Sequence, residues 1–295
     1  MNRRPYTVPL PGRDPLHLGA RTLVMAILNV TPDSFADGGR YRDLDAAVDA
    51  GVRMAAEGAD IIDVGGESTR PGAAGVTEEE ELRRAIPVVE RLAQRVEIPI
   101  SIDTYKARVA REAVAAGAVI VNDVSGLLYE PALGGVVAET GAALILMHTR
   151  GRSMDMYGLA VYDDVVREVC GELEQAIVRA TAAGVRREAL VLDPGFGFAK
   201  RAEHSITLLA GLDALAAIDR PILSGPSRKS FLKAATGNVA AAEREWATAA
   251  AVTASVLHGA HIVRVHGVAA MRDVVRLADL IREARMKTWQ SGCSQ

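Results

Sequence analysis

The sequence predicts an α/β protein folded as a single (β/α)8 TIM barrel, and three observations lead to this prediction. Short apolar runs alternate with longer amphipathic, Ala-rich segments; eight such pairs follow one another; and no Pro- or Ser-rich linker divides the 295 residues. Nearly continuous apolar runs are typical of parallel strands that are covered on both faces. Eight evenly spaced βα units close into a barrel more naturally than they splay into an open doubly wound sheet, which is the alternative.

The eight strands are expected where short β-branched apolar runs occur. They occupy residues 22–30, 60–65, 98–103, 119–123, 143–148, 189–193, 221–225 and 261–266. Helical patterns with one apolar face fill 44–57, 78–95, 107–116, 162–183, 243–258 and 268–285. One domain is expected over 1–295, with residues 1–20 and 287–295 peripheral to it.

Glycine recurs where a helical segment gives way to a strand. The positions are Gly58, Gly117, Gly141, Gly184 and Gly259. Because glycine readily takes the left-handed conformation that ends a helix, these residues predict the turns between helices and strands.

Composition excludes several classes of function. The formal net charge of -3 and the lack of a basic run argue against nucleic-acid or membrane-surface binding as the main activity. Two cysteines, Cys170 and Cys293, are too few and too poorly placed for a disulfide framework, which suits a reducing cytoplasm. The first residues, "MNRRPYTVPLPGRDP", contain no apolar signal segment, and no apolar stretch approaches a membrane span. We therefore expect a cytoplasmic protein.

Polar side chains stand at the ends of nearly all predicted strands. They are Asn29, Asp63, Asp103, Asn122, Asp123, His148, Asp193, Arg264 and His266. A lone Asp or Asn at a strand end is most often a cap or turn residue. In a parallel barrel, however, all these ends meet at the catalytic face, where unpaired carboxylates are costly. The pattern therefore predicts a polar ligand bound in the mouth of the barrel.

The loops that follow the strands indicate what this ligand carries. "GPSRKSF", after the seventh strand, places Arg228, Lys229 and two hydroxyls where a helix N-terminus also points, which suits phosphate. Carboxylates lie on the other side, at Asp103 and Asp193. The two long loops "NVTPDSFADGG" and "GGESTRPGAAG" are interpreted as lids. We expect a hydrogen-bond-donating heterocycle joined to a phosphorylated group.

The histidine spacing does not fit a zinc site, because the chain has no HxH, HExxH or CxxC motif. Asn29 and loop carboxylates could instead hold Mg²⁺ together with phosphate oxygens. The four phenylalanines all lie in loops. Phe196 and Phe231 are interpreted as packing loops onto the barrel, and Phe35 and Phe198 as ligand contacts.

The motifs "ILNVTPDSFADGG", "DVGGESTRPG", "SIDTYK", "NDVSG", "LMHTRG", "DPGFGFAK", "GPSRKSF" and "RVH" follow one another in this chain. With them the chain resembles the dihydropteroate synthase family over residues 22 to about 285. The resemblance implies a transferase of folate biosynthesis that joins 6-hydroxymethyl-7,8-dihydropterin pyrophosphate to p-aminobenzoate, with sulfonamides as competitors. It also implies a homodimer, for which the Ala-rich helix at 243–258 is a candidate interface.

The resemblance further implies a role for each matching residue. The pterin would bind Asp103, Asn122, Asp193 and Lys229, and pyrophosphate would bind Asn29, Arg264 and His266, with Mg²⁺ held through Asn29. p-Aminobenzoate would contact Phe35, Asp37, Thr69, Arg70, Pro71, Phe198 and Ser230. The catalytic groups would be Asp103, Lys229, Arg264 and His266. The family commonly has Asp where this chain has Gly267, and Ser where it has Ala36; neither change removes a residue expected to touch a ligand.

The expected chemistry relies on charge and position. A carboxylate such as Asp193 can accept paired bonds from the guanidine-like edge of a pterin, and Lys229 can donate to the acceptors of the ring. The amine of p-aminobenzoate is unprotonated at neutral pH, so neither a covalent nucleophile nor a strong general base is required. Two rivals remain at this stage: a methyltransferase on the same barrel that binds methyltetrahydrofolate, and a pterin-binding protein without turnover.

Overall fold

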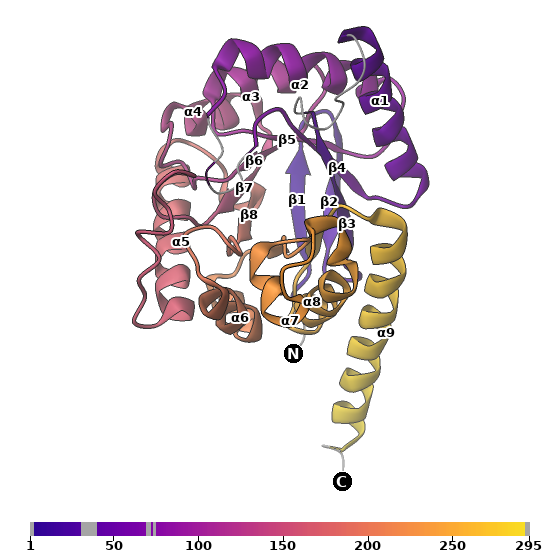
Figure 1. Ribbon diagram of the computed structural model, residues 1–295, viewed down its shortest axis with the longest axis vertical. Helices are drawn as coiled ribbons and strands as arrows, with labels where there is room; N and C mark the ends of the chain where they lie inside the picture. The colour runs from indigo at the N-terminus through magenta and orange to yellow at the C-terminus, as the bar shows by residue number, and fades with distance from the viewer. Residues whose placement is uncertain (1–2, 31–39, 69–71, 73–74, 293–295) are drawn as a thin grey trace.

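The computed structural model describes residues 3–30, 40–68, 72 and 75–292. Eight parallel strands form the central sheet in the order β8-β7-β6-β5-β4-β3-β10-β9. A bridge between Leu192 and Ile222, with a bond from Leu192 N to Pro221 O at 2.9 Å, joins the two ends of this sheet. The sheet is therefore a closed barrel, surrounded by helices (Figure 1), and the predicted fold class is confirmed.

All eight predicted strands are present within a few residues of the expected bounds. The strands are β3 Leu23–Asn29, β4 Ile61–Gly65, β5 Ile100–Asp103, β6 Ile120–Asp123, β7 Ala143–Met147, β8 Leu190–Asp193, β9 Leu223–Ser224 and β10 Ile262–Val265. The α-helices are α1 Arg40–Ala56, α2 Glu78–Ala93, α3 Ala107–Ala115, α4 Ala132–Thr140, α5 Val165–Ala182, α6 Ala202–Ala210, α7 Lys233–Thr236, α8 Glu245–Leu257 and α9 Val268–Gly292. The helices α4, α6 and α7 are not among the helical segments that the sequence analysis located.

The five glycines that were expected to end helices all have positive φ. The angles are 101° at Gly58, 115° at Gly117, 72° at Gly141, 93° at Gly184 and 95° at Gly259. Each lies in the region that L side chains disfavour, which confirms the turn prediction.

The two-residue period of the strands decides which side chains point into the barrel. Ile61 belongs to the apolar cluster inside the ring, whereas Ile62 packs against the helices outside it. Asp63 is two residues beyond Ile61 and therefore points inward. By the same alternation, a set of strand-end side chains points into the mouth of the barrel: Asn29, Asp103, Asn122, Asp193 and Arg264. Asp123 and His148 follow outward-facing residues and point toward the helices.

An antiparallel hairpin of β1 Tyr6–Leu10 and β2 Arg13–Leu18 precedes the barrel. Its Val8, Leu10 and Leu18 are buried in the cluster inside the ring, beside Met25 and Ile61. The expectation that residues 1–20 are peripheral is corrected in this respect. The hairpin lies outside the ring of strands, but its apolar face is part of the barrel core because alternate residues of this segment are apolar.

The last helix ties the start of the chain to its end. Arg3, almost fully buried, donates to Asp279 of α9 at 3.1 Å and to the backbone oxygen of Ala260 at 2.5 Å. Helix α9 runs along one side of the molecule and continues past its edge (Figure 1). Among the described residues, no helix combines the length and apolar character needed to cross a bilayer.

Candidate active site

A buried ion pair network occupies the mouth of the barrel. Arg264 at the end of β10 donates from Nε to Oδ2 of Asp63 at 2.6 Å and from Nη2 to Oδ2 of Asp103 at 2.7 Å. Asn122 Nδ2 also donates to Asp63 Oδ2, at 2.9 Å. The guanidinium group of Arg264 thereby joins the ends of β10, β4 and β5, and Asp63 adds the end of β6. Asp63, fully buried, is a further member of the site; the sequence places it at a strand end but does not assign it to any ligand.

The two carboxylates of this network are not fully satisfied. Asp63 Oδ1 and Asp103 Oδ1 are buried and have no hydrogen-bond partner in the part of the chain that the structure describes. Burial raises the pKa of Asp103 to about 7; the charge of Arg264 opposes this rise and the neighbouring Asp63 adds to it. A buried acceptor without a donor is costly, so Asp103 Oδ1 is a candidate acceptor for a hydrogen bond from a ligand.

Asp193 and Lys229 extend the same site. Asp193 Oδ1 accepts the backbone N–H of Gly195 at 2.7 Å. Burial raises the pKa of the Asp193 carboxyl, while the positive charges of Lys229 and Arg264 act to lower it. The same two cations act on Asp103. The charges of Lys229 and Arg264 therefore act on both predicted carboxylates, Asp103 and Asp193.

Phe198 packs beneath Lys229 rather than standing free at the rim. Its ring lies 4.0 Å from Nζ of Lys229 and is buried among Val124, Met147 and Met156. The ring thus supports the lysine that was expected to bind pterin. Phe196 and Phe231 are both buried in the main core with their ring centres 5.8 Å apart, as predicted for residues that pack loops onto the barrel.

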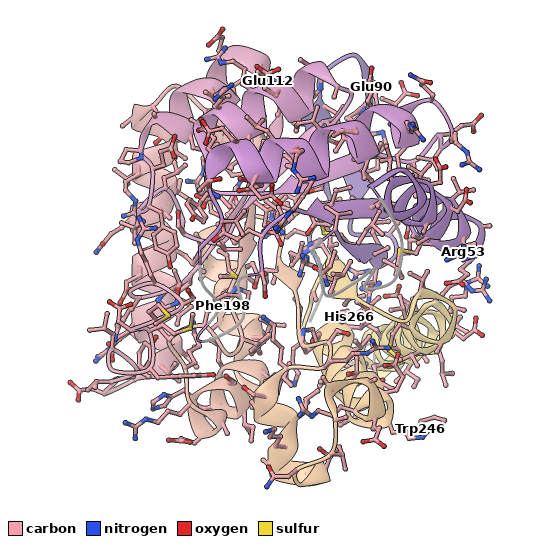
Figure 2. All side chains as sticks on the ribbon, turned by 45° about the horizontal axis from the view of Figure 1, so that its top comes forward. Arg53, Glu90, Glu112, Phe198, Trp246 and His266 are labelled. Atoms are coloured by element: carbon pink, nitrogen blue, oxygen red, sulfur yellow. The ribbon has the colours of Figure 1, made fainter. Side chains whose placement is uncertain are left out.

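The loop between β9 and α7 contacts His266, which the resemblance had assigned to pyrophosphate. Ser227 Oγ lies 2.9 Å from Nδ1 of His266 and accepts the backbone N–H of the same histidine at 3.2 Å. Ser227 therefore fixes the orientation of His266, a role that the sequence did not reveal. Ser230 is exposed at the first residue of a short 3₁₀ helix, Ser230–Leu232. Figure 2 shows Phe198 and His266 on the inner side of the ring of helices.

Asn29 ends β3 at the same mouth. A Cβ placed on Gly65 would lie 3.7 Å from Oδ2 of Asp103 and 3.8 Å from Oδ1 of Asn29, so both oxygens face this glycine. Both are hard oxygen ligands of the kind that Mg²⁺ prefers. Among the described residues, no group of three His, Cys, Asp or Glu side chains could hold a metal by itself. A cation here would need further oxygens from substrate and water.

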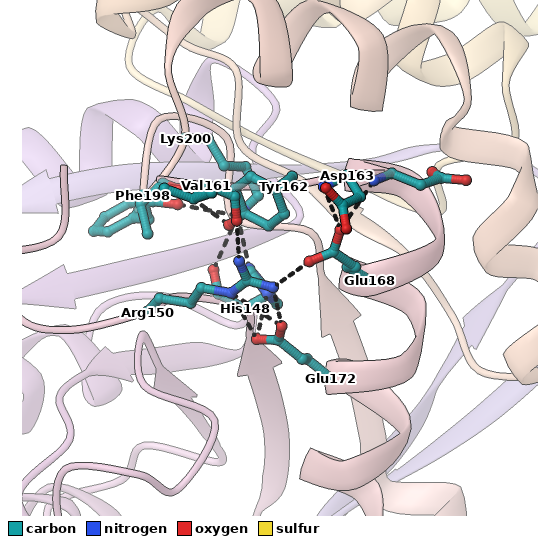
Figure 3. A network of polar contacts seen from close by, with 11 residues as sticks. His148, Arg150, Val161, Tyr162, Asp163, Glu168, Glu172, Phe198 and Lys200 are labelled. Atoms are coloured by element: carbon teal, nitrogen blue, oxygen red, sulfur yellow. Dashed lines mark hydrogen bonds and ion pairs between the residues drawn. The ribbon is translucent and has the colours of Figure 1, made fainter. Parts of the chain in front are cut away.

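A second buried network lies behind the mouth, between β7, α5 and the loop after β8 (Figure 3). Lys200 Nζ lies 2.7 Å from Nδ1 of His148 and donates to the backbone oxygens of Gly195 at 3.1 Å and Phe198 at 3.0 Å. His148 Nε2 lies 3.0 Å from a carboxylate oxygen of Glu172. Three acceptors match the three N–H bonds of the ammonium group.

This network holds the "DPGFGFAK" loop in place. Burial lowers the pKa of Lys200 to about 7 and the pKa of His148 to about 4. A neutral His148 can accept from Lys200 through Nδ1 and donate to Glu172 through Nε2. His148 had been noted at a strand end, but the structure turns it away from the mouth. Lys200 had not been singled out, although its place in the most aromatic loop of the chain was a signal.

The structure thus brings together most of the residues that the sequence had assigned to the pterin and to pyrophosphate. Asp103, Asn122 and Arg264 are joined by Asp63, and Asp193 lies with Lys229 in the same mouth. The expected p-aminobenzoate contacts Phe35, Asp37, Thr69, Arg70 and Pro71 lie outside the described residues.

Comparison with known proteins points to one family. Residues 25–266 match the family model described as pterin binding enzyme. The dihydropteroate synthase of Synechocystis sp. is 46% identical over 277 residues, which cover 94% of this chain and 96% of that protein. The solved Xanthomonas albilineans dihydropteroate synthase with 4-aminobenzoic acid has a TM-score of 0.86 at 44% identity, and covers 94% of this chain and 99% of its own. The Yersinia pestis enzyme in a sulfonamide drug complex has a TM-score of 0.87 at 42% identity, with the same coverage.

The barrel with its acid-lined mouth thus defines the chain as a pterin-binding enzyme. Among these enzymes, the chain belongs to the dihydropteroate synthases, the transferases of folate synthesis that its motifs predicted.

Proposed function

We propose that this chain joins 6-hydroxymethyl-7,8-dihydropterin pyrophosphate to p-aminobenzoate in the barrel mouth, releasing 7,8-dihydropteroate and pyrophosphate. One observation carries the proposal: Asp103 is buried beside Arg264 and keeps an acceptor oxygen without a partner among the described residues. A flat ligand with several N–H donors supplies what this oxygen lacks. A methyltetrahydrofolate-dependent methyltransferase has no need of the Arg264 and His266 pair, and family membership disfavours it.

At the pterin end, recognition depends on matched donors and acceptors. Asp193 Oδ1 accepts the backbone N–H of Gly195, and the carboxylate would accept a further N–H donor from the ring. Lys229 stands on Phe198 with its ammonium group near that carboxylate, and it can donate to the carbonyl and ring nitrogen of a pterin. Asn122, held by Asp63, offers a further polar group. These contacts orient the ring and fix its methylene carbon.

At the pyrophosphate end, catalysis relies on positive charge. The C–O bond of the methylene carbon breaks with its electron pair on pyrophosphate, the amine of p-aminobenzoate forms the new C–N bond, and the amine proton leaves to solvent. Arg264 and His266 stabilise the departing anion, and Asp103 stabilises positive charge on the ring. The amine needs no strong base, because it is neutral at pH 7.

Asn29 Oδ1 faces Gly65 in the barrel mouth, and there Asn29 would hold Mg²⁺ together with substrate oxygens. When bound, the ion would neutralise charge on the leaving pyrophosphate. Asn29 then serves to place the cation at the pyrophosphate end, away from Asp193 and Lys229.

The decisive experiment measures pyrophosphate release with and without p-aminobenzoate, for the wild type and Asp193→Asn. The variant replaces one acceptor oxygen by a donor, so we expect at least about tenfold weaker pterin binding. Pterin affinity is also measured alone, by calorimetry. Release that does not depend on p-aminobenzoate would refute the proposed reaction, and unchanged affinity in Asp193→Asn would refute the placement of the ring.

We also propose that the enzyme is a cytoplasmic homodimer that pairs through α8 and α9. Trp246 in the first turn of α8 is 89% exposed and points away from the barrel at the edge of the molecule (Figure 2). Leu277 and Leu280 of the adjacent α9 are 61% and 63% exposed. Exposed large apolar side chains on neighbouring helices favour an interface. Cys170 is a free thiol, which suits a reducing compartment.

A further inference from the structure

Arg228 has an unusual backbone conformation and lies between two residues of the candidate site, Ser227 and Lys229. Its φ angle is 58°, in the left-handed region that side chains with a Cβ disfavour. The residue before it is Ser227, which orients His266, and the residue after it is Lys229, which stands on Phe198. A strained residue between two such groups persists only where its surroundings hold it.

Three residues from the start of α8 hold Arg228. Thr248 Oγ1 accepts the backbone N–H of Arg228 at 3.0 Å, and Arg244 Nη1 donates to the backbone oxygen of Arg228 at 3.0 Å. The side chain of Arg228 donates from Nε to Oε2 of Glu245 at 3.2 Å. Arg244 is itself buried and donates to Val239 O at 2.8 Å. The backbone and the side chain of Arg228 are therefore both bound to one helical turn.

Glu245 also touches the residue that follows His266. A Cβ placed on Gly267 would lie 2.2 Å from Oε1 of Glu245. The φ angle of Gly267 is not in the positive range, so its backbone would accept other residues. Glycine at position 267 is favoured by lack of space, because the carboxylate of Glu245 fills the volume that a side chain would take. One carboxylate thus lies between the Arg228 loop and the turn after His266.

We propose that Glu245 is a positioning residue, which keeps Ser227, Lys229 and His266 in register by binding Arg228 and packing on Gly267. This inference rests on the proposed function, because it concerns the groups that bind pterin pyrophosphate. Glu245 itself does not touch the reacting atoms. Because Oε1 is the end of a flexible side chain, a methyl group at 267 displaces the carboxylate without disturbing the backbone.

The test is a double-mutant cycle with Glu245→Ala, Gly267→Ala and the variant that carries both. Each single change breaks the same contact, so we expect each to lower kcat/KM for pterin pyrophosphate about tenfold and the pair to lower it no further. The KM for p-aminobenzoate should stay within about twofold, because the carboxylate acts on residues assigned to pterin and pyrophosphate. Glu245→Gln keeps an acceptor for Arg228 and should recover part of the loss.

A matched control is Glu90→Ala, a change of an exposed glutamate on α2 that lies far from this contact (Figure 2). Calorimetric titration of every variant with inorganic pyrophosphate and Mg²⁺ gives a readout that does not need turnover. Additive losses, or kinetics and pyrophosphate affinity of Glu245→Ala equal to those of the control, would overturn the positioning role. If the wild type binds pyrophosphate but shows no turnover, the proposed function alone is refuted. If the wild type shows neither pyrophosphate binding nor turnover, the proposed function and the positioning role of Glu245 are both refuted.

Discussion

Arg264 Nη2 donates to Asp103 Oδ2 at 2.7 Å, so the cation expected to bind pyrophosphate and the acid expected to bind pterin are bound to each other. The two ends of the proposed substrate therefore meet at one ion pair. Because Asp63 accepts from the same guanidinium at 2.6 Å, Arg264 can give up part of its contact with Asp103 to a phosphate and remain neutralised. The bond that breaks lies between the two groups that this pair would stabilise.

Pterin affinity should rise with pH through about 7. Burial raises the pKa of Asp103 to about 7, so at lower pH its carboxyl holds a proton and loses an acceptor for the ring. Calorimetric titration with 6-hydroxymethylpterin, which lacks phosphate, from about pH 5.5 to 8.5 measures the effect; one protonated group weakens binding at most about tenfold per pH unit. Asp103→Asn should bind weakly at every pH. A variant that keeps the wild-type slope would show that another group titrates.

Asp63→Ala should lower both activity and stability. The change leaves the guanidinium of Arg264 bound to Asp103 alone among the described residues, and it removes the acceptor of Asn122. Breaking a buried pair of this kind costs about 3 kcal/mol of unfolding free energy, and we expect kcat/KM for pterin pyrophosphate to fall at least about tenfold. Urea denaturation and the synthesis assay measure the two effects.

The matched control for that prediction is Asp123→Ala. Asp123 is also a buried strand-end aspartate, but it accepts from the backbone N–H groups of Ser125 and Leu127 at 2.8 and 2.6 Å and points toward the helices. Its loss should cost about 1–2 kcal/mol of stability and leave pterin affinity unchanged. Equal losses of kcat/KM in the two variants would contradict the assignment of Asp63 to the active site.

Much of this arrangement follows from the sequence. Eight apolar runs, with glycines such as Gly58 and Gly259 at the helix ends, defined the barrel, and strand-end polar residues defined its mouth. The two-residue alternation along each strand also separates Asp63, which points inward, from Asp123 and His148, which do not. That signal was available in the apolar residues two positions earlier.

Other features could not be predicted from local patterns. Glu245 meets Gly267 only because α8 and α9 pack side by side, and nothing in either segment alone indicates the contact. The same holds for Lys200, whose partner His148 lies 52 residues earlier. Pairs of this kind depend on where the barrel places its helices and loops, and the hydrophobic period carries no information about them.

Lys200 should make stability depend on pH in the alkaline range. Its folded pKa is lowered to about 7 by burial, from an ordinary value of 10.5. Below pH 7 Lys200 is protonated in both the native and the unfolded chain, so the full cost of burying its charge is present. Above pH 7 the native state loses this proton first, so stability rises with pH until Lys200 of the unfolded chain also titrates. The free energy of unfolding of the wild type should therefore rise relative to that of Lys200→Met by at most about 1.4 kcal/mol per pH unit between pH 7 and 10. Parallel urea-denaturation curves across this range would contradict the expectation.

Removal of Mg²⁺ should slow turnover through Asn29. Chelation is expected to lower kcat of the wild type, whereas Asn29→Ala, which loses the amide oxygen, should show a weaker response and need more Mg²⁺ for half-maximal rate. Binding of 6-hydroxymethylpterin provides a control, because the ion belongs to the pyrophosphate end and pterin affinity should not change. The same magnesium requirement in the wild type and Asn29→Ala would place the ion elsewhere.

Trp246→Glu should convert the proposed dimer to a monomer. The side chain is 89% exposed on α8, and a charge there would have to be buried, unpaired, when the two copies meet. Val178→Glu is a suitable control, because Val178 is 65% exposed on α5, on another part of the barrel surface. Sedimentation velocity at about 10 µM protein should give a dimer for the wild type and for Val178→Glu, and at least about a tenfold higher dissociation constant for Trp246→Glu. A monomeric wild type would refute the homodimer. A Trp246→Glu dimer as tight as the wild type would instead move the interface away from the start of α8.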